Sequence, residues 1–173
     1  SLRYALMAAC LLHDVGNPPF GHTGEAVIRR WFKENAAVRE CEGLTPCQKK
    51  DLTTFEGNAN SVRIAINSTC MCDGRRLNLT ATTIAALVKY PYKALDEKAP
   101  EEQEGEDCAA RSKFNYFSDD FEKLESYMKD CGDGFTKLTE GYRHPLSFFL
   151  EASDDVSYVT SDFEDAFRKQ KFT

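Results

Sequence analysis

The sequence of 173 residues contains no apolar run near the roughly 20 residues that a membrane-spanning helix requires. It also lacks an excess of basic residues, because 22 lysines and arginines stand against 28 aspartates and glutamates and leave a net charge of −6. That balance argues against a broad nucleic-acid-binding surface, although a local one stays compatible with it. Apolar residues at 42% and charged residues at 29% are ordinary values for a globular chain.

A disulfide or zinc framework also lacks support, despite seven cysteines. Cys70 and Cys72 are separated by one residue rather than by the two that typify zinc and redox pairs, and no second pair matches them. Scattered thiols without a pairing pattern are typical of a reduced intracellular protein. We therefore expect a cytoplasmic protein with no membrane contact.

Two-residue alternation, which marks half-buried strands, is convincing nowhere, and no internal repeat is present. Helical spacing is present instead. Apolar residues recur at steps of four, three and four from Leu2 to His13, which predicts a first helix with His13 on its buried stripe. The glycine and two prolines within residues 16–19 end this helix in a rigid turn.

Five further helices are predicted from the same spacing and from end signals. The first two are a helix over about 23–32, with Val27, Ile28, Trp31 and Phe32 on its buried side, and a helix marked by Phe55, Ala59, Val62 and Ile66. The others cover about 80–90 and the residues from Ser118 through Met128, and a last helix follows Pro145. Its apolar face, from Phe148 through Val156 and Val159 to Ala166, is expected to be buried.

The remaining segments are expected to lack helix. Residues 35–50 show no clear period and are predicted to be loop, and the acidic stretch at about 96–112 is predicted to be a solvated loop. A short β-hairpin is compatible with residues 71–79 and 113–117. The fold class expected is all-α, a helical bundle of one domain over residues 1–173.

Residues suited to metal chemistry lie near both ends of the chain. His13 precedes Asp14 directly, but a lone core histidine with one hydrogen bond is the commoner case. Asp154, Tyr158 and Asp162 recur every four residues opposite the apolar stripe of the last helix, and a solvated acidic face explains them equally well. An imidazole with two carboxylates would nonetheless suit a hard or borderline divalent cation, which acidifies bound water and neutralises phosphate.

Two further pairs are open to both functional and structural interpretations. His22 and Glu25 stand three residues apart at the start of a helix, where the imidazole could move a proton and the carboxylate could fix its tautomer. A local surface hydrogen bond explains the same spacing. Lys89 and Tyr90 end another helix, where a lysine either complements the helix dipole or meets a phosphate as a point charge.

Four motifs together resemble one family. The string HDVGNPPFGHTGE (His13 to Glu25) resembles the HD-superfamily deoxynucleoside triphosphate triphosphohydrolases, the dGTPase family, and three later stretches agree in the family's order. These are FEGNAN (Phe55 to Asn60), LVKYPY (Leu87 to Tyr92) and EASDDVSYVTSDFEDA (Glu151 to Ala166). The resemblance spans nearly the whole chain, whereas the His-Asp dipeptide alone would also fit phosphodiesterases and nucleotidases.

The resemblance implies a set of site residues within an HD-domain helical bundle. It assigns a divalent metal ion (Mg²⁺, Mn²⁺ or similar) to His13, Asp14 and Asp154, and proton transfer to His22 with Glu25 as its partner. It assigns substrate contacts to Asn58, Lys89, Tyr90, Tyr158 and Asp162, with Lys89 on the triphosphate and the last two near the deoxyribose.

The chain departs from the family pattern at its ends. Family members supply a fourth metal ligand, a histidine upstream of the pair, and none of the twelve residues before His13 is histidine. His144 precedes Pro145 and matches a position that is not a ligand. The family also continues beyond Thr173. We therefore expect a domain that is incomplete at both ends, a central fragment that is weakly active or inactive by itself.

The activity implied is metal-dependent hydrolysis of a deoxynucleoside triphosphate, with dGTP as the expected substrate, to deoxynucleoside and inorganic triphosphate. Two alternatives stay open: an HD phosphohydrolase acting on a nucleoside monophosphate or cyclic nucleotide, and a catalytically silent nucleotide-sensing module. The family also implies a homo-oligomer, commonly a hexamer, and single-stranded DNA as a possible effector.

Overall fold

The computed structural model describes residues 1–67, 77–94, 113–129 and 141–171. Every regular element in these ranges is helical, which confirms the all-α fold. None of these helices combines the length and apolar character that crossing a bilayer requires. In chain order they are α1 (Leu2–Leu12), α2 (Gly21–Glu34), α3 (Ala36–Arg39), α4 (Pro46–Thr53), α5 (Gly57–Asn67), α6 (Ala81–Leu87), the 3₁₀ helix η1 (Ser118–Asp120), α8 (Phe121–Lys129) and α10 (Pro145–Arg168).

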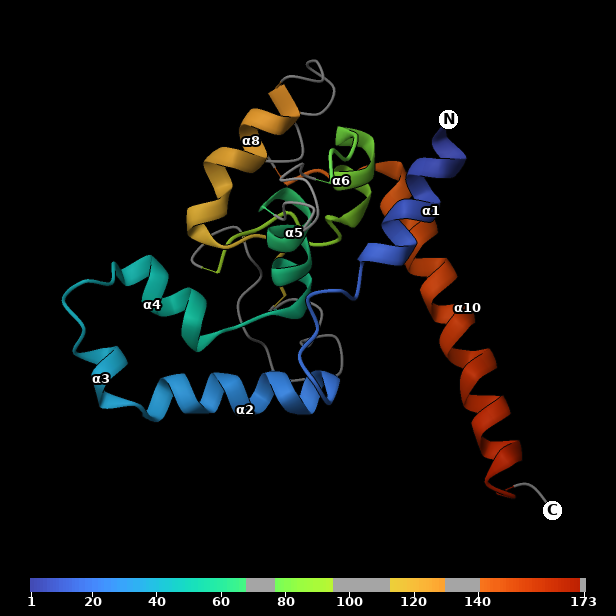
Figure 1. Ribbon diagram of the computed structural model, residues 1–173, viewed down its shortest axis with the longest axis horizontal. Helices are drawn as coiled ribbons and strands as arrows, with labels where there is room; N and C mark the ends of the chain where they lie inside the picture. Colours follow the sequence, from blue (N-terminus) through green and yellow to red (C-terminus); the bar gives the residue numbers. More distant parts are fainter. Residues whose placement is uncertain (68–76, 95–112, 130–140, 172–173) are drawn as a thin grey trace.

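The main core lies where α1, α5, α6, α8 and α10 meet (Figure 1). Helix α6 is central, because it packs against each of the other four. Its sequence ATTIAAL is rich in small side chains, which allow neighbouring helices to approach closely. The largest apolar side chains fully buried in this core are Ile66, Ile84, Tyr116, Leu124, Met128 and Leu150. This packing brings α1 and α10, from the two ends of the chain, into direct contact.

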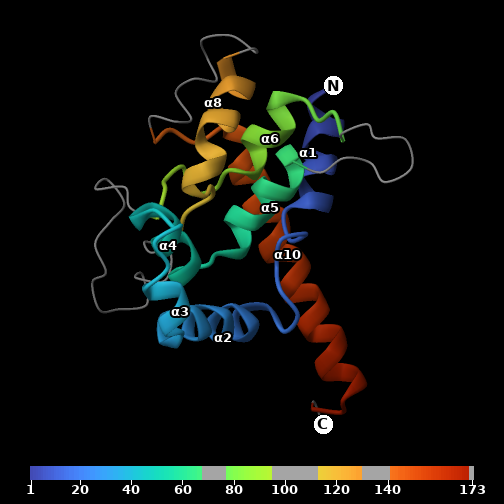
Figure 2. The same cartoon turned by 60° about the vertical axis from the view of Figure 1, so that its left-hand side comes forward.

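Helices α2, α3 and α4 form an arm beside this core, with α4 returning over α2 (Figures 1 and 2). The prediction of which α2 side chains are buried is only half correct. Ile28 and Phe32 are partly buried, whereas Val27 and Trp31 are more than half exposed. The arm has one layer, so α4 covers a single stripe of α2 and leaves the neighbouring apolar positions uncovered.

The prediction that residues 35–50 form a loop is wrong, because local caps start two short helices there. Asn35 begins α3, and its side chain accepts a hydrogen bond from the Ala37 amide at 3.0 Å. Thr45 begins α4 through a reciprocal capping box with Gln48, and Pro46 occupies the first helical turn. Caps satisfy the free amides of a helix end, so a segment with no apolar period can still be helical.

Helix α6 ends at Leu87, three residues before the predicted end at Tyr90. The Asn115 side chain causes the early stop by replacing helical hydrogen bonds at this point. Its amide nitrogen donates to the Leu87 carbonyl at 3.3 Å, and its oxygen accepts from the Tyr90 amide at 2.6 Å. The other predicted helices are confirmed with shifted bounds, since α2 is longer than expected and α5 begins after Phe55.

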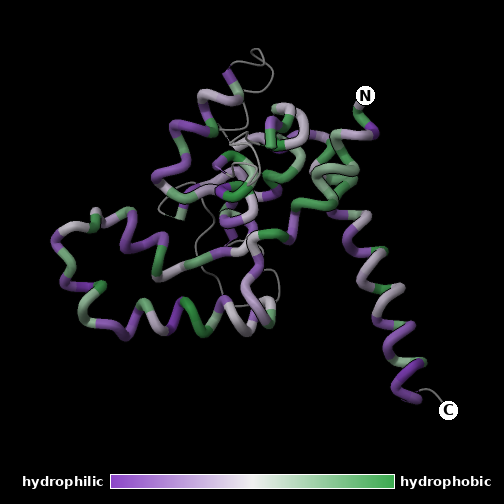
Figure 3. The backbone as a smooth tube through the Cα atoms, in the orientation of Figure 1, coloured by the Kyte–Doolittle hydropathy of each residue, from purple (hydrophilic) through white to green (hydrophobic). Residues whose placement is uncertain are grey.

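The prediction that the apolar face of α10 is buried is wrong over most of its length. Leu150 is fully buried, but Phe148, Val156 and Val159 are more than half exposed. The C-terminal half of α10 extends away from the rest of the molecule in both views (Figures 1 and 2). Apolar and polar residues alternate along this projecting part (Figure 3). Periodicity identified the apolar side of the helix, but the described residues place no neighbour against it.

Several predictions concern residues outside the described ranges. The acidic loop at 96–112 lies there, as do Cys70, Cys72, Cys108 and Cys131. The described parts of the proposed hairpin, residues 77–79 and 113–117, contain no strand. Three described cysteines, Cys10, Cys41 and Cys47, form no disulfide.

Candidate active site

The imidazole of His13 is oriented by the helix that it ends. His13 is the C-terminal cap of α1, and its backbone amide still donates to the Ala9 carbonyl. Its side-chain Nδ1 lies 2.7 Å from the Cys10 carbonyl oxygen, which can only accept a hydrogen bond. Nδ1 therefore carries a proton, and Nε2, the nitrogen that could offer a lone pair to a metal ion, points away from α1 toward two carboxylates.

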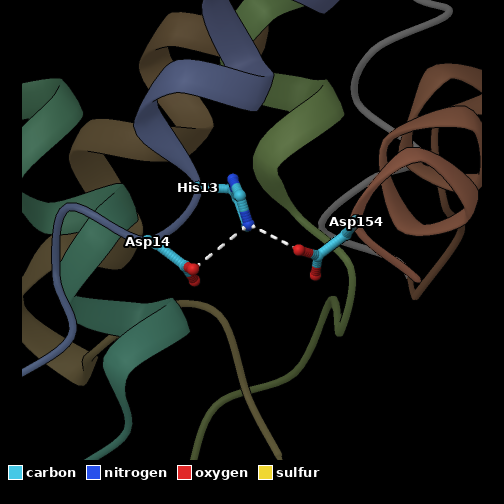
Figure 4. A group of neighbouring side chains, drawn as sticks. All are labelled: His13, Asp14 and Asp154. Atoms are coloured by element: carbon cyan, nitrogen blue, oxygen red, sulfur yellow. Dashed lines mark hydrogen bonds and ion pairs between the residues drawn. The ribbon is translucent and has the colours of Figure 1, made fainter. Parts of the chain in front are cut away.

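Three ligand atoms converge around this lone pair (Figure 4). Nε2 of His13 lies 3.1 Å from Oδ1 of Asp154 and 3.4 Å from Oδ2 of Asp14. One ligand atom from each residue lies within 4.8 Å of the others. Such close approach is favourable when Nε2 carries a proton or when a cation lies among the three atoms, and a neutral imidazole with two carboxylates suits a divalent cation. The donor set therefore fits a metal ion.

Asp154 links this group of ligands to a lysine. Its second oxygen, Oδ2, accepts a hydrogen bond from Nζ of Lys89 at 3.2 Å. Lys89 follows the end of α6 and is only 8% exposed, so its ammonium lies in a largely dry setting. The pKa of the nearby Cys10 thiol is raised. Burial is the main cause, and the negative charge of Asp154 adds to it, whereas the positive charge of Lys89 opposes it.

Asp14 is more open to solvent and is held from two sides. Its Oδ1 accepts a hydrogen bond from the Asn17 amide at 2.9 Å, and its Oδ2 accepts one from the Tyr158 hydroxyl at 3.4 Å. The negative charge of Asp14 is the main reason that the pKa of Tyr158 is raised, followed by burial and by the charge of Asp154. The phenol therefore stays protonated and donates to Asp14.

His22 and Glu25 form a pair at the start of α2. Nδ1 of His22 lies 3.0 Å from Oε2 of Glu25, and the other Glu25 oxygen accepts from the Gly57 amide at 2.7 Å. The two side chains differ sharply in burial, since His22 is 81% exposed and Glu25 only 4%. A buried carboxylate with a hydrogen bond at each oxygen thus holds an imidazole whose Nε2 stays available to solvent or substrate.

A second buried carboxylate lies beside this pair. Arg29 lies 3.5 Å from Glu25 and 3.0 Å from Glu56, and so connects the two acids. Asn58, a predicted substrate contact, donates to Oε1 of Glu56 at 2.7 Å. Desolvation raises the pKa of Glu56 despite the opposing effects of Asn58 and Arg29.

The remaining two predicted residues, Tyr90 and Asp162, are not among the three that share the metal-ligand geometry. Tyr90 is partly buried, and desolvation is the first cause of its raised pKa. Asp162 is exposed two helical turns beyond Asp154 on α10. Its charge contributes to the raised pKa of Tyr158, but it is not one of the three residues that share the metal-ligand geometry in the described structure.

Curated proteins with similar sequences carry closely related names. The chain is 40% identical over 172 residues to a deoxyguanosinetriphosphate triphosphohydrolase-like protein of Listeria monocytogenes, covering 95% of this chain and 34% of the relative. It is 35% identical to a protein of the same name from Synechocystis, covering 94% and 37%. It is 34% identical to a deoxyguanosinetriphosphate triphosphohydrolase of an Enterobacter species, covering 95% and 35%. The chain is therefore similar in sequence to these triphosphohydrolases and triphosphohydrolase-like proteins over about 95% of its own length.

The chain spans about a third of the length of these curated relatives of the triphosphohydrolase family. No family profile matches it. The likeness therefore rests on sequence identity across nearly all of this chain rather than across the whole of any relative.

The sequence analysis did not single out the residues that hold the predicted site residues in place through hydrogen bonds and ion pairs. Asn17 holds Asp14, Arg29 connects Glu25 with Glu56, and the Ser61 hydroxyl donates to the His13 carbonyl at 2.6 Å. Asn17 lies three residues after Asp14 within the recognised turn, so its spacing was a usable signal. Ser61 offered none, because only the packing of α5 against the turn after α1 brings it to His13.

Proposed function

We propose that the chain carries catalytic machinery of a metal-dependent deoxynucleoside triphosphate triphosphohydrolase, with dGTP as the expected substrate. The observation that carries this proposal is the convergence of His13, Asp14 and Asp154 from opposite ends of a chain whose relatives bear that name. The products would be a deoxynucleoside and inorganic triphosphate.

His13 would offer the Nε2 lone pair, and Asp14 and Asp154 one oxygen each, to a divalent ion. When bound, such an ion acidifies coordinated water and stabilises charge on a phosphoryl group. His22 would transfer a proton at Nε2, because its Nδ1 is held by Glu25. This division keeps the proton-transfer residue exposed and its orienting partner buried.

The substrate contacts follow from charge and position. Lys89 would meet the triphosphate as a point charge, and the phenol of Tyr158 would lie on the deoxyribose side with Asp162. Asn58 and Tyr90 would line the site. The exposed apolar face of α10 supports assembly into a homo-oligomer, because large exposed apolar surfaces commonly mark protein contacts.

Mn²⁺ binding, followed by electron paramagnetic resonance, tests the metal site without requiring turnover. The Asp154→Asn variant should bind Mn²⁺ at least about tenfold more weakly, because one of two ligand carboxylates loses its charge. Asp155→Asn is the matched control, since Asp155 is the exposed neighbour on the same helix and is not among the three ligand residues. Equal Mn²⁺ affinity in the two variants would contradict the assignment.

Product analysis tests the reaction. With dGTP and Mn²⁺, anion-exchange chromatography should detect deoxyguanosine and triphosphate. The rate should be low for residues 1–173, because the histidine that the resemblance implies as a fourth metal ligand is not among the residues before His13. Release of pyrophosphate or monophosphate would reject the proposal.

Lys89→Ala should remove most triphosphatase activity, whereas an enzyme for monophosphates or cyclic nucleotides should lose little. Saturable dGTP binding without turnover in a full-length homologue would favour a silent sensing module.

A further inference from the structure

Two buried carboxylates and one arginine lie behind the exposed imidazole of His22. Glu25 and Glu56 are 3% and 2% exposed. Their Oε2 atoms lie 3.5 Å and 3.0 Å from the same nitrogen of Arg29, Nη2. Arg29 is partly buried, and its Nε also donates to the Phe55 carbonyl. Two acids therefore share one guanidinium.

The charges in this group repel each other as well as attract. Burial is the main cause of the raised pKa of Glu56, and the negative charge of Glu25 adds to it. The hydrogen bond from Asn58 and the positive charges of Arg29 and Lys113 oppose it. Glu25 and Glu56 thus destabilise each other's ionised form, and Arg29 is a cation that contacts both.

Without that cation, the ionisation of Glu25 would change. Neighbouring carboxylates that are removed from water share one proton rather than both staying ionised. This affects His22, because Oε2 of Glu25 lies 3.0 Å from its Nδ1. An ionised carboxylate can only accept, so it keeps the imidazole proton on Nδ1. A protonated Glu25 would donate to Nδ1 instead and leave the imidazole proton on Nε2.

We propose that Arg29 is a positioning residue: by keeping Glu25 and Glu56 ionised together, it holds the imidazole of His22 in the tautomer with its proton on Nδ1. Arg29 acts on His22 through Glu25. The inference rests on the proposed function, in which His22 transfers a proton at Nε2, and it extends that function by one residue.

The ¹⁵N shifts of an imidazole distinguish its two tautomers without metal, substrate or turnover. Long-range ¹H–¹⁵N correlation of residues 1–173 at about pH 7, above the ordinary imidazole pKa of about 6.5, should show His22 with its proton on Nδ1. His22→Gln identifies the signal among those of the three histidines.

In Arg29→Gln, the fraction of His22 with its proton on Nε2 should rise at least about fivefold, because a charge-assisted hydrogen bond to an ionised Glu25 is lost. Arg30→Gln is the matched control, since Arg30 is the exposed neighbour of Arg29 on α2. It should leave the tautomer ratio unchanged.

A second substitution separates the charge of Arg29 from its packing. The Arg29→Gln, Glu56→Gln double variant keeps one buried acid, Glu25, which should stay ionised because its neighbour is neutral. The tautomer ratio should then return to within about twofold of that of the unsubstituted chain. Removing Glu56 would not restore the ratio if Arg29 acted through packing alone.

Three results would overturn the proposal: a proton on Nε2 of His22 in the unsubstituted chain, an unchanged tautomer ratio in folded Arg29→Gln, and a double variant that recovers neither ratio nor fold. If Arg29→Gln does not fold, a folded double variant with the proton of His22 on Nδ1 supports the proposal. Failure of the proposed function gives a different result, because absence of triphosphate release from dGTP would leave these tautomers as they are.

Discussion

At the scale of single residues, the candidate site depends on groups that fix the direction of a ligand. The Cys10 carbonyl determines which nitrogen of His13 carries the proton, and the Asn17 amide holds one oxygen of Asp14. Such supporting contacts commonly contribute about 10- to 100-fold to metal affinity. They are therefore testable apart from the ligands themselves.

Asn17→Ala should weaken Mn²⁺ binding by about tenfold, because Asp14 is half exposed and loses the shorter of its two orienting hydrogen bonds. Titration followed by electron paramagnetic resonance measures the effect. Asn58→Ala is the control, since its amide donates to Glu56 rather than to a metal-ligating residue. An unchanged affinity in Asn17→Ala would show that Asp14 does not need the Asn17 hydrogen bond to bind the metal.

Asp51 makes stability depend on pH in a direction that can be stated. Burial raises its pKa above the ordinary 3.8, opposed by Ser118 and Arg63 and reinforced by Asp119. The folded state then binds the proton of Asp51 more tightly than the unfolded state does. This proton therefore stabilises the fold fully below pH 3.8, and its contribution to the free energy of unfolding is lost as pH rises through the folded pKa. Asp51→Asn should therefore be more stable than the unsubstituted chain at pH 7.

That gain should disappear when the pH falls below about 3.8, where the carboxyl is neutral in both states. Urea unfolding at several pH values measures it. An Asp51→Asn variant that is less stable at pH 7 would mean that the hydrogen bonds from Ser118 and the charge of Arg63 stabilise the ionised carboxylate more than burial destabilises it.

At the scale of elements, the turn after α1 is packed directly onto the backbone of α5. A β-carbon added at Gly16 would lie 2.1 Å from the Ser61 backbone nitrogen, closer than any real contact permits. Ser61 in turn accepts from the Gly16 amide and donates to the His13 carbonyl. The motif glycine therefore sets the distance between the metal-ligating turn and α5.

Gly16→Ala should lower the free energy of unfolding by about 1–3 kcal/mol or more, because backbone must move to admit the methyl group. Gly43→Ala is the matched control, since its added carbon would meet only the Cys41 sulfur at 3.7 Å. Urea denaturation compares the two variants. Equal stability would show that α5 can shift without loss.

How far the sequence predicts the structure differs from element to element. Spacing placed α1, α5, α8 and α10, because a one-sided apolar stripe has the helical period. It missed α3 and α4, because these helices begin at the caps Asn35 and Thr45 rather than following an apolar period. It also could not show that Asn115, from a distant segment, ends α6. The meeting of His13 with Asp154 came from family resemblance, since spacing cannot show which helices touch.

At the scale of the whole molecule, α10 has two very different halves. Its first turns pack into the core through Leu150, and its later turns extend from the body with Val156 and Val159 more than half exposed. An apolar stripe on a projecting helix favours self-association, because contact removes the stripe from water.

We expect the chain to self-associate, and a Val156→Ser, Val159→Ser double variant to do so at least about tenfold more weakly. Sedimentation velocity over a range of concentrations measures this. Leu77→Ser removes a partly exposed apolar side chain elsewhere and should leave association unchanged. Identical sedimentation of the double variant and the unsubstituted chain would exclude α10 as the contact surface.

The ammonium of Lys89 and the imidazole of His13 share one carboxylate, that of Asp154. An anion that draws Lys89 toward itself would release one oxygen of Asp154 and leave that group more negative toward a cation. A cation seated beside His13 would in turn compete with Lys89 for Asp154 and free the lysine for phosphate. Polyphosphate and metal should accordingly strengthen each other's binding by the same factor.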